Sequence, residues 1–196
     1  ITDTQSLTDS ATIEITVVGV PDLDPPTVLS FGRNNGNGLF HTLTSVAFQF
    51  NEDVSAGLGA DDLVLFNTTT TTPINTSLAT VSWNAESNTA HWDLTSLSLE
   101  IGSYFVALDA QGLTDAAGNL LDGNLDGTGG DDYQSSLILT WQGDVDLDLD
   151  VDFGDFVTLS NNFGNGGVSW FEGDFNGDTH VQFGDFVGLS NNFGQS

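Results

Sequence analysis

Short runs of alternating apolar and polar residues fill the chain from residue 27 to residue 141. A period of two is typical of strands that bury one face of a sheet, and turn-forming residues separate one run from the next. Successive strands at spacings of about ten residues predict a sandwich, so the expected fold class is mainly β. The expected strands are TVLSF, SVAFQF, DLVLF, ATVSW, AHWDL, YFVALDA and SSLILTW.

A helical period appears near the C-terminus, in two copies. In each copy apolar residues stand at i, i+3 and i+7, and a glycine follows where a helix C-cap glycine belongs. Each copy therefore predicts one helix of about two turns. The residues concerned are Phe156, Leu159, Phe163 and Gly164 in the first copy, and Phe186, Leu189, Phe193 and Gly194 in the second.

Composition narrows the functions that this pattern allows. Arg33 is the one Lys or Arg among 196 residues, against 28 Asp and Glu, which gives a formal charge of −27. Because nucleic-acid binding depends on Lys and Arg, the charge excludes a nucleic-acid partner, and it disfavours an anionic membrane surface. No apolar run is long enough for membrane insertion, and there is no Cys. The hydrophobic content of 38% still predicts a folded chain.

The two helical segments belong to a longer repeat. GDVDLDLDVDFGDFVTLSNNFG, residues 143–164, aligns without a gap with GDFNGDTHVQFGDFVGLSNNFG, residues 173–194. If the first copy were a strand, its alternate Asp side chains would share one face and repel one another. If it is a loop, the same spacing puts oxygen atoms at positions 1, 3, 5, 7, 9 and 12, as in an EF-hand-type calcium loop. The second copy keeps oxygen at these positions but not acidity, which favours coordination of a cation.

Two such loop–helix units, joined by NGGVSWFE, resemble a type I dockerin, a calcium-binding module that docks onto a cohesin partner. The resemblance covers residues 143–194 and implies a small α domain of two EF-hand-like repeats over residues 142–196. It implies one calcium ion on Asp144, Asp146, Asp148, Asp152, Asp155 and the carbonyl of Asp150, and a second on Asp174, Asn176, Asp178, Gln182, Asp185 and the carbonyl of His180. The position-12 residues, Asp155 and Asp185, are expected to open the helices, where the dipole favours an anion.

This chain departs from the dockerin pattern at two places. Position 6, normally Gly, is Leu149 in one loop and Thr179 in the other, which is expected to distort the loops or lower their affinity. The positions before the last ligand, often small polar residues that meet the cohesin, are Phe153-Gly154 and Phe183-Gly184. The expected protein partner is therefore cohesin-like or a further copy of the chain.

The size of the segment supports a metal without the family name. About 50 residues with two short helices rarely hold a fold by their core alone, and metal binding is one remedy. We therefore expect calcium binding and folding of this segment to be one event. Magnesium is less suited to a loop that offers so many protein oxygens. The alternative is a solvated acidic linker.

The preceding region resembles a bacterial Ig-like domain, of the kind found in tandem on large secreted and cell-surface proteins. That family's strand ending Phe-x-Glu-x-Val appears, slightly shifted, within FQFNEDVS, and its Asp-x-Ala-Gly-Asn turn at Asp115 to Asn119. The resemblance implies an Ig-like β-sandwich over residues 22–141, entered through the prolines of residues 24–26. The order of the two domains is similar to C-termini of large exported proteins of planctomycete-type bacteria, which implies a secreted or cell-surface location.

Residues 1–21 carry one further expected strand, ATIEITVVGV, before Pro21. The segment resembles the closing strand of a preceding cadherin-like or Ig-like repeat. It is a remnant of that domain, pairs with an edge of the following sandwich, or completes another molecule by strand addition. The sequence leaves these three fates open.

A weaker calcium signal lies before the last expected strand. Asp122, Asn124 and Asp126, followed by Gly127, give the first half of an EF-type loop. Asp131 and Asp132 are placed to close it, although position 12 itself is Tyr133. The loop is either a third calcium site over residues 122–132 or an Asp-rich turn whose carboxylates face water.

Catalysis is not expected. His41, His91 and His180 are far apart in sequence, and the chain has no Lys, no Gly-rich phosphate loop and no Ser on a strand-to-helix turn. Carboxylates are too abundant to single out a glycosidase dyad. Trp83 and Trp92 fit either a sugar-stacking platform or the core face of a hairpin.

The expected function is that of a non-catalytic calcium-binding region that anchors or assembles a secreted or cell-surface protein through its dockerin-like module. The alternatives are a structural subunit of a surface layer or extracellular fibre, and a carbohydrate-binding accessory of a lost catalytic domain. Exposed Phe153 and Phe183 would favour the first function. A strand from residues 12–20 lodged in a neighbouring molecule would favour the second, and exposed coplanar Trp83 and Trp92 the third.

Overall fold

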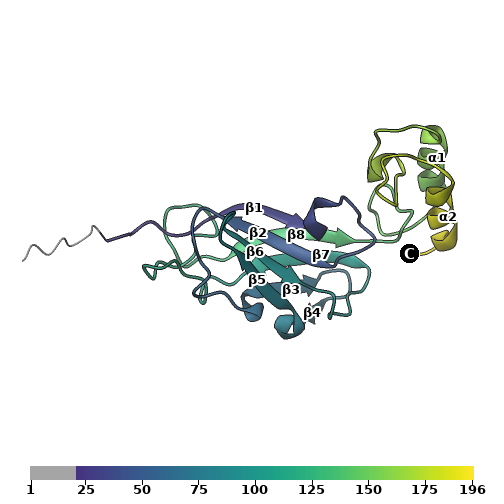
Figure 1. Cartoon of the computed structure of the whole chain (residues 1–196). Coiled ribbons are helices and arrows are strands. Elements are labelled where there is room, and N and C mark those ends of the chain that lie inside the picture. Colours follow the sequence, from purple (N-terminus) through teal and green to yellow (C-terminus); the bar gives the residue numbers. More distant parts are fainter. Residues whose placement is uncertain (1–20) are drawn as a thin grey trace, which may run out of the picture.

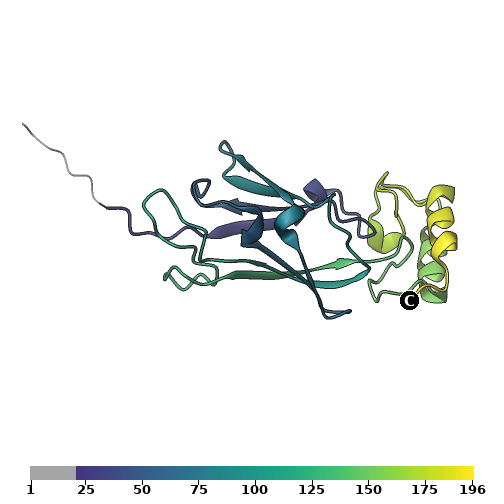
Figure 2. The same cartoon turned by 90° about the horizontal axis from the view of Figure 1, so that it is seen from below.

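The alternating runs form strands in the computed structural model, which describes residues 21–196. The strands are β1 (Val28–Arg33), β2 (Ser45–Phe50), β3 (Leu63–Asn67), β4 (Thr72–Ile74), β5 (Thr80–Asn84), β6 (Thr89–Asp93), β7 (Gly102–Leu108) and β8 (Tyr133–Leu139). They make two four-stranded antiparallel sheets, ordered β1-β2-β6-β5 and β4-β3-β7-β8. The mainly β fold class is therefore confirmed, and Figures 1 and 2 show the two sheets as layers.

The core lies between the two sheets, because each strand turns its apolar residues inward. On β6, for example, Ala90 and Trp92 are buried while the residues between and beside them are partly exposed. Phe48 of β2 meets Trp92 edge to face, with ring centroids 5.5 Å apart, and meets Tyr133 of β8 in the same way at 5.7 Å. The contact between Phe48 and Tyr133 crosses from one sheet to the other and joins the two layers into one core.

The β4 strand was not among the expected strands, because Pro73 interrupts its run. It pairs with β3 through Phe66 and Pro73 and forms the edge of its sheet. A proline is tolerated there because it has no N–H to donate to a further neighbour.

The carbohydrate platform is not formed. Trp92 is fully buried in the sandwich core, and its Nε1 donates to the carbonyl oxygen of Gly59 at 3.3 Å. Trp83 is half-buried and packs against the same core. The interpretation of these two residues as core residues is therefore the correct one, and a stacking surface made of both is excluded.

The two predicted helices are α1 (Phe153–Asn162) and α2 (Phe183–Asn192). Both begin two residues before Asp155 and Asp185, so these aspartates do not open the helices as expected. They stand instead at N3, in a capping box with Asp152 or Gln182 as the N-cap residue.

The helix ends follow the prediction. Each helix is followed by a C-cap phenylalanine and then by a glycine with a left-handed φ, +86° at Gly164 and +83° at Gly194. Only glycine adopts this conformation without a steric cost, which explains the end of each helix.

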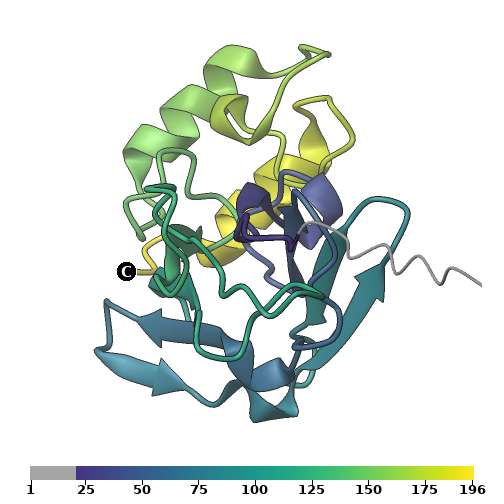
Figure 3. The same ribbon diagram turned by 90° about the vertical axis from the view of Figure 1, so that its left-hand side faces the viewer.

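A second core holds the two loop–helix units together. Its buried residues are Val145, Val151, Leu159, Trp170, Phe175, Val181 and Leu189. We call residues 142–196, which carry both units, the repeat pair. The repeat pair lies beyond one end of the sandwich, where β8 ends, and both helices are seen past the sandwich from its other end (Figures 1 and 3). Leu39, Phe40 and Trp141, outside the repeat pair, pack against this second core.

Two further expectations concern the segment before the sandwich and membrane insertion. The strand expected over residues 11–20 lies outside the described residues. Neither α1 nor α2 has the length and apolar character needed to cross a bilayer, and residues 21–196 contain no other helix that does.

Replacement of Trp92 by Ala should destabilise the sandwich by about 3–5 kcal/mol, because it opens a large cavity in a fully packed core. Leu78→Ala is the control, since Leu78 is 61% exposed. It should change the free energy of unfolding by no more than about 0.5 kcal/mol. Urea denaturation followed by far-UV circular dichroism measures the free energy of unfolding of each variant. Equal losses in the two variants would contradict the assigned core.

Candidate metal centre

The first loop, residues 144–155, winds around the carboxylate of Asp144. This side chain is fully buried and accepts the backbone N–H groups of Leu147 at 2.7 Å, Asp148 at 3.2 Å and Leu149 at 2.9 Å. No strand forms at these positions. The loop interpretation of the aspartate ladder is therefore confirmed.

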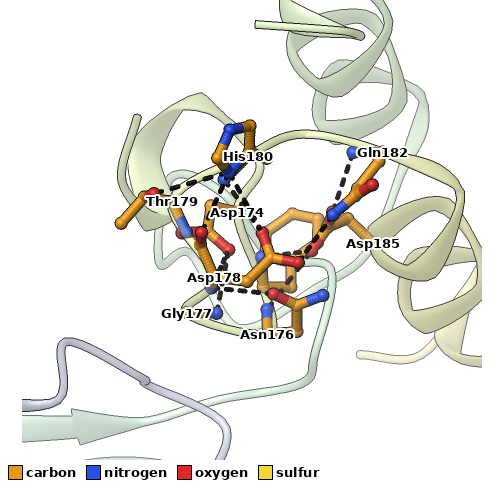
Figure 4. A network of polar contacts seen from close by, with 9 residues as sticks. Asp174, Asn176, Gly177, Asp178, Thr179, His180, Gln182 and Asp185 are labelled. Atoms are coloured by element: carbon orange, nitrogen blue, oxygen red, sulfur yellow. Dashed lines mark hydrogen bonds and ion pairs between the residues drawn. The ribbon is translucent and has the colours of Figure 1, made fainter. Parts of the chain in front are cut away.

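The second loop, residues 174–185, has the same internal geometry. Asp174 accepts the N–H groups of Gly177 at 2.8 Å, Asp178 at 3.2 Å and Thr179 at 2.7 Å. Figure 4 shows these bonds with the side chains around them. Two sequences that differ at many positions thus build one loop conformation.

The position-12 aspartates close both loops. Asp155 is buried, and its two oxygens accept the N–H groups of Val145 and Asp152, each at 2.7 Å. Asp185 is buried in the same way and accepts the N–H of Gln182 at 2.9 Å. Each carboxylate therefore ties the beginning of its loop to the beginning of its helix.

The remaining predicted ligands of the second loop lie together at its outer side. Asn176 Oδ1 accepts the N–H of Asp178 at 2.9 Å, and Asp178 Oδ1 accepts that of His180 at 2.9 Å. Gln182 Nε2 donates to Asp178 Oδ2 at 2.7 Å. The imidazole of His180 is exposed, with Nδ1 4.0 Å from Asp178 Oδ1. His180 thus has its ring at the rim of the loop.

Position 6 is not distorted in either loop. Leu149 has φ +77° and Thr179 has φ +67°, the left-handed conformation that glycine usually supplies there. Both N–H groups still bond to the position-1 carboxylate. For a residue with a Cβ this conformation costs about 1–2 kcal/mol, so the loops keep their geometry at the expense of local strain.

The first loop gathers carboxylates that fit a hard cation. Oxygen atoms of Asp144, Asp146 and Asp148 lie within 4.8 Å of one another, and so do those of Asp150, Asp152 and Asp155. Asp150 Oδ1 is buried and has no hydrogen-bond partner. Oxygen ligands of this kind suit calcium, and an unpartnered buried carboxylate oxygen is costly without one.

The electrostatics of the first loop also favour a cation. Burial, and then the charges of Asp144 and Asp146, raise the pKa of Asp155 to about 6. Burial and neighbouring carboxylates likewise raise the pKa of Asp144 and of Asp150. Like charges held close together disfavour ionisation, and a divalent ion removes that penalty.

The loop over residues 122–132 repeats the first half of this geometry. Asp122 is buried and accepts the N–H groups of Asp126 at 3.2 Å and Gly127 at 2.8 Å, and Asn124 Oδ1 also accepts that of Asp126 at 2.9 Å. Its closure differs, because the N–H at position 2 goes to the backbone oxygen of Asp131 at 2.9 Å. Asp132 is engaged elsewhere, accepting the N–H of Ala110.

One acidic cluster was not predicted. Asp22, Glu52 and Asp115 bring carboxylate oxygens within 4.8 Å of one another in the sandwich domain. Burial and then the charges of Asp115 and Asp22 raise the pKa of Glu52. Glu52 and Asp115 both lie in motifs that suggested the Ig-like resemblance, so the signal was present in the sequence. The cluster alone does not define a site.

Comparisons with known proteins give similarity of structure only. No protein-family model matches the chain, and no curated protein matches it. The N-terminal part of the bacterial S-layer protein SbsC is 18% identical, with a TM-score of 0.39 over 58% of this chain and 23% of that one. SbsC domains 1–6 are 18% identical, with a TM-score of 0.39 over 58% of this chain and 13% of that one. The S-layer protein rSbsC(31-844) is 19% identical, with a TM-score of 0.37 over 56% of this chain and 13% of that one. The matched part thus spans less than a quarter of each SbsC chain, and likeness at this level assigns no function.

Relief of strain at position 6 provides a test of the loop conformation. Thr179 is exposed and β-branched, so Thr179→Gly should raise the free energy of unfolding in calcium by about 0.5–1 kcal/mol. Thr158→Gly places the same change inside α1 and should lower it, because glycine is unfavourable in a helix. Thermal denaturation of both variants checks the opposite signs, and two losses of stability would contradict the left-handed conformation.

The raised pKa of Asp155 predicts a pH dependence of the calcium-free chain. Since the folded pKa of about 6 lies above the ordinary value of 3.8, folding favours the protonated carboxyl. The stability that this group contributes is complete below the unfolded pKa and is lost as pH rises through 6. In chelator, the wild type should therefore gain stability relative to Asp155→Asn as pH falls from 7 to 5. Urea denaturation at both pH values measures this difference, in which contributions from histidines cancel, and no change would contradict the assignment.

Proposed function

We propose that this chain is a non-catalytic, calcium-stabilised region of a secreted or cell-surface protein. In it, a dockerin-like module over residues 142–196 follows an Ig-like sandwich over residues 22–141 and anchors or assembles the parent protein through a protein partner. The observation that carries the proposal is the duplicated loop. Two copies with different sequences bury the position-1 and position-12 carboxylates and bond them to the same backbone groups.

Calcium is the ion that this donor set suits best. The first loop offers carboxylate and carbonyl oxygens, and the second offers amide oxygens as well, at the spacing that surrounds calcium with six or more ligands. Magnesium prefers a smaller octahedral site and keeps several waters. One ion in each loop accounts for the clustered carboxylates of the first loop and for the retained oxygens of the second. A third ion in the loop over residues 122–132 is supported because the first half of that loop makes the same hydrogen bonds to its position-1 aspartate.

The partner surface of the module is a row of four phenylalanines across both helices. Ring centroids are 5.9 Å apart between Phe153 and Phe156, 6.5 Å between Phe156 and Phe186, and 6.2 Å between Phe186 and Phe183. We call these four residues the aromatic row. Its end residues, Phe153 and Phe183, are 67% and 69% exposed. Large exposed aromatic side chains grouped in this way are typical of protein-binding surfaces.

Charge favours a different protein over a second copy of the chain. A chain with a formal charge of −27 repels its own copies, whereas a partner with basic residues around an apolar surface is attracted. Assembly of copies into a layer or fibre remains the alternative function, and the strand expected at residues 12–20 to carry it lies outside the described residues.

Calcium should stabilise the full chain. At a calcium concentration of about 100 times Kd, one occupied site adds about 2.7 kcal/mol to the free energy of unfolding. Asp148→Asn and Asp178→Asn should each reduce this gain, because they remove a ligand charge while Asn keeps the oxygen that accepts an N–H. Asp93→Asn is the control, since Asp93 caps a similar turn on the sandwich outside the loops. Thermal denaturation in calcium and in chelator measures the gain, and an equal gain in all variants would contradict the proposed ligands.

The aromatic row should be required for partner binding and not for folding. Phe153→Ser and Phe183→Ser together should leave calcium binding unchanged, because both side chains are exposed. The paired variant should fail to retain surface proteins of the source organism that the immobilised wild-type chain retains. Val64→Ser is the control, since Val64 is an exposed apolar residue of the sandwich strand β3 and lies outside the repeat pair. Equal retention by all three chains would contradict a docking role for the row.

A further inference from the structure

The one basic residue of the chain fixes a sandwich loop beside the repeat pair. Arg33, at the end of β1, donates to the carbonyl oxygens of Ile138 and of Thr42, the latter at 2.8 Å. Its guanidinium carbon lies 5.0 Å from the centre of the Phe40 ring. We call residues 34–42 the Arg33 loop. The guanidinium holds this loop, through Thr42 and the ring of Phe40, to Ile138 of strand β8.

The Arg33 loop contacts the repeat pair at two points. Phe40 packs on Trp170 with ring centroids 5.5 Å apart, and His41 stacks on the same indole at 5.6 Å. Leu39 lies over the second loop, because a Cβ added at Gly177 would be 3.4 Å from Leu39 Cδ2. The sandwich thus reaches an indole of the second core and the backbone of a metal loop.

Phe40 is connected to the first ligand of the first loop, Asp144, by two routes, one through Trp170 and one through Thr140. Trp170 Nε1 donates to the carbonyl oxygen of Asp144 at 2.6 Å. Thr140, which follows β8 and is fully buried, donates its hydroxyl to Asp144 Oδ2, while its N–H donates to the carbonyl oxygen of Phe40 at 3.0 Å. The residue directly after the sandwich's last strand therefore joins the Arg33 loop to a predicted metal ligand.

The two loops differ in this respect. Asp144 accepts a side-chain hydroxyl in addition to three backbone N–H groups. Asp174, at the same position of the second loop, accepts backbone N–H groups alone within residues 21–196. The sandwich therefore holds the carboxylate of one loop directly and touches the other only by packing.

We propose that Thr140 and Trp170 are positioning residues for the first metal loop, through which the sandwich sets the affinity of that loop for calcium. The proposal rests on the calcium binding proposed above. A partner hydrogen-bonded to a metal ligand fixes the ligand's orientation, and its loss typically lowers metal affinity by about 10–100-fold. Because binding linkage is reciprocal, calcium in the first loop also stabilises the joint between sandwich and repeat pair.

The decisive variant is Thr140→Val in the full chain, which removes the hydroxyl and keeps the shape of the side chain. Thr140→Ser is the companion variant, which keeps a hydroxyl at this position. Thr158→Val is the matched control, because the Thr158 hydroxyl bonds to the carbonyl oxygen of Gly154 inside α1 and to no ligand. Calcium titrations followed by amide NMR resolve the loops, with the N–H of Leu149 reporting the first and that of Thr179 the second.

We expect Thr140→Val to weaken calcium binding at the Leu149 reporter by about tenfold or more and at the Thr179 reporter by less than about twofold. Thr140→Ser and Thr158→Val should bind as the wild type does. Trp170→Phe, which keeps a ring but loses the N–H, should repeat the selective loss at the first loop.

Two results would overturn the proposal while calcium binding itself stands. One is a Thr140→Val chain that binds calcium in both loops with wild-type affinity. The other is equal weakening at both reporters, which would mean a general loss of stability. A wild-type chain whose reporters do not respond to millimolar calcium would instead remove the calcium proposal, and with it the basis of this inference.

Discussion

Carboxylates held close together in a folded chain favour the uptake of protons or of a cation, and the first loop of the repeat pair is built around that constraint. Asp144 and Asp155 are almost completely buried, and neighbouring charges add to the effect of burial on the pKa of Asp155. Their oxygens organise the loop backbone, and Asp155 also completes the capping box of α1. Asp155 therefore serves the loop and the helix start together. The same carboxylates that make the segment unfavourable without a cation give it its shape.

The sandwich contacts the first loop of the repeat pair through very few groups. Arg33 offsets little of the chain's negative charge, which is −27 overall. Its importance lies in the loop that it holds in place. It fixes the loop that places Phe40 on Trp170, and Trp170 in turn holds the carbonyl of Asp144. The two cores, the two acidic loops and Arg33 are thus linked by short contacts. Rigidity at this joint would give the aromatic row a defined direction relative to the sandwich.

The sequence predicted what depends on local period and spacing. Strand β2 has the bounds that its alternating run indicated, and both helices end at the expected glycines. Strand β4 was not predicted, because it contains Pro73, and proline is tolerated in an edge strand but not in a central one. The helix starts were misplaced by two residues, since the position-12 aspartates also serve as N3 residues of a capping box. The contacts of Phe40 with Thr140 and with Trp170 join residues far apart in sequence and follow no period, so only the structure revealed them.

The most direct measurement is the number of calcium ions that the full chain holds, by native mass spectrometry from calcium-containing and chelator-treated solution. The account predicts at least two tightly bound ions that chelator removes. Asp148→Asn should remove one of them and Asp178→Asn another, while Asp93→Asn keeps them all. A chain that holds no calcium at millimolar concentration, or that holds as many ions in both loop variants as in the wild type, would contradict the proposal that the duplicated loops are two calcium sites.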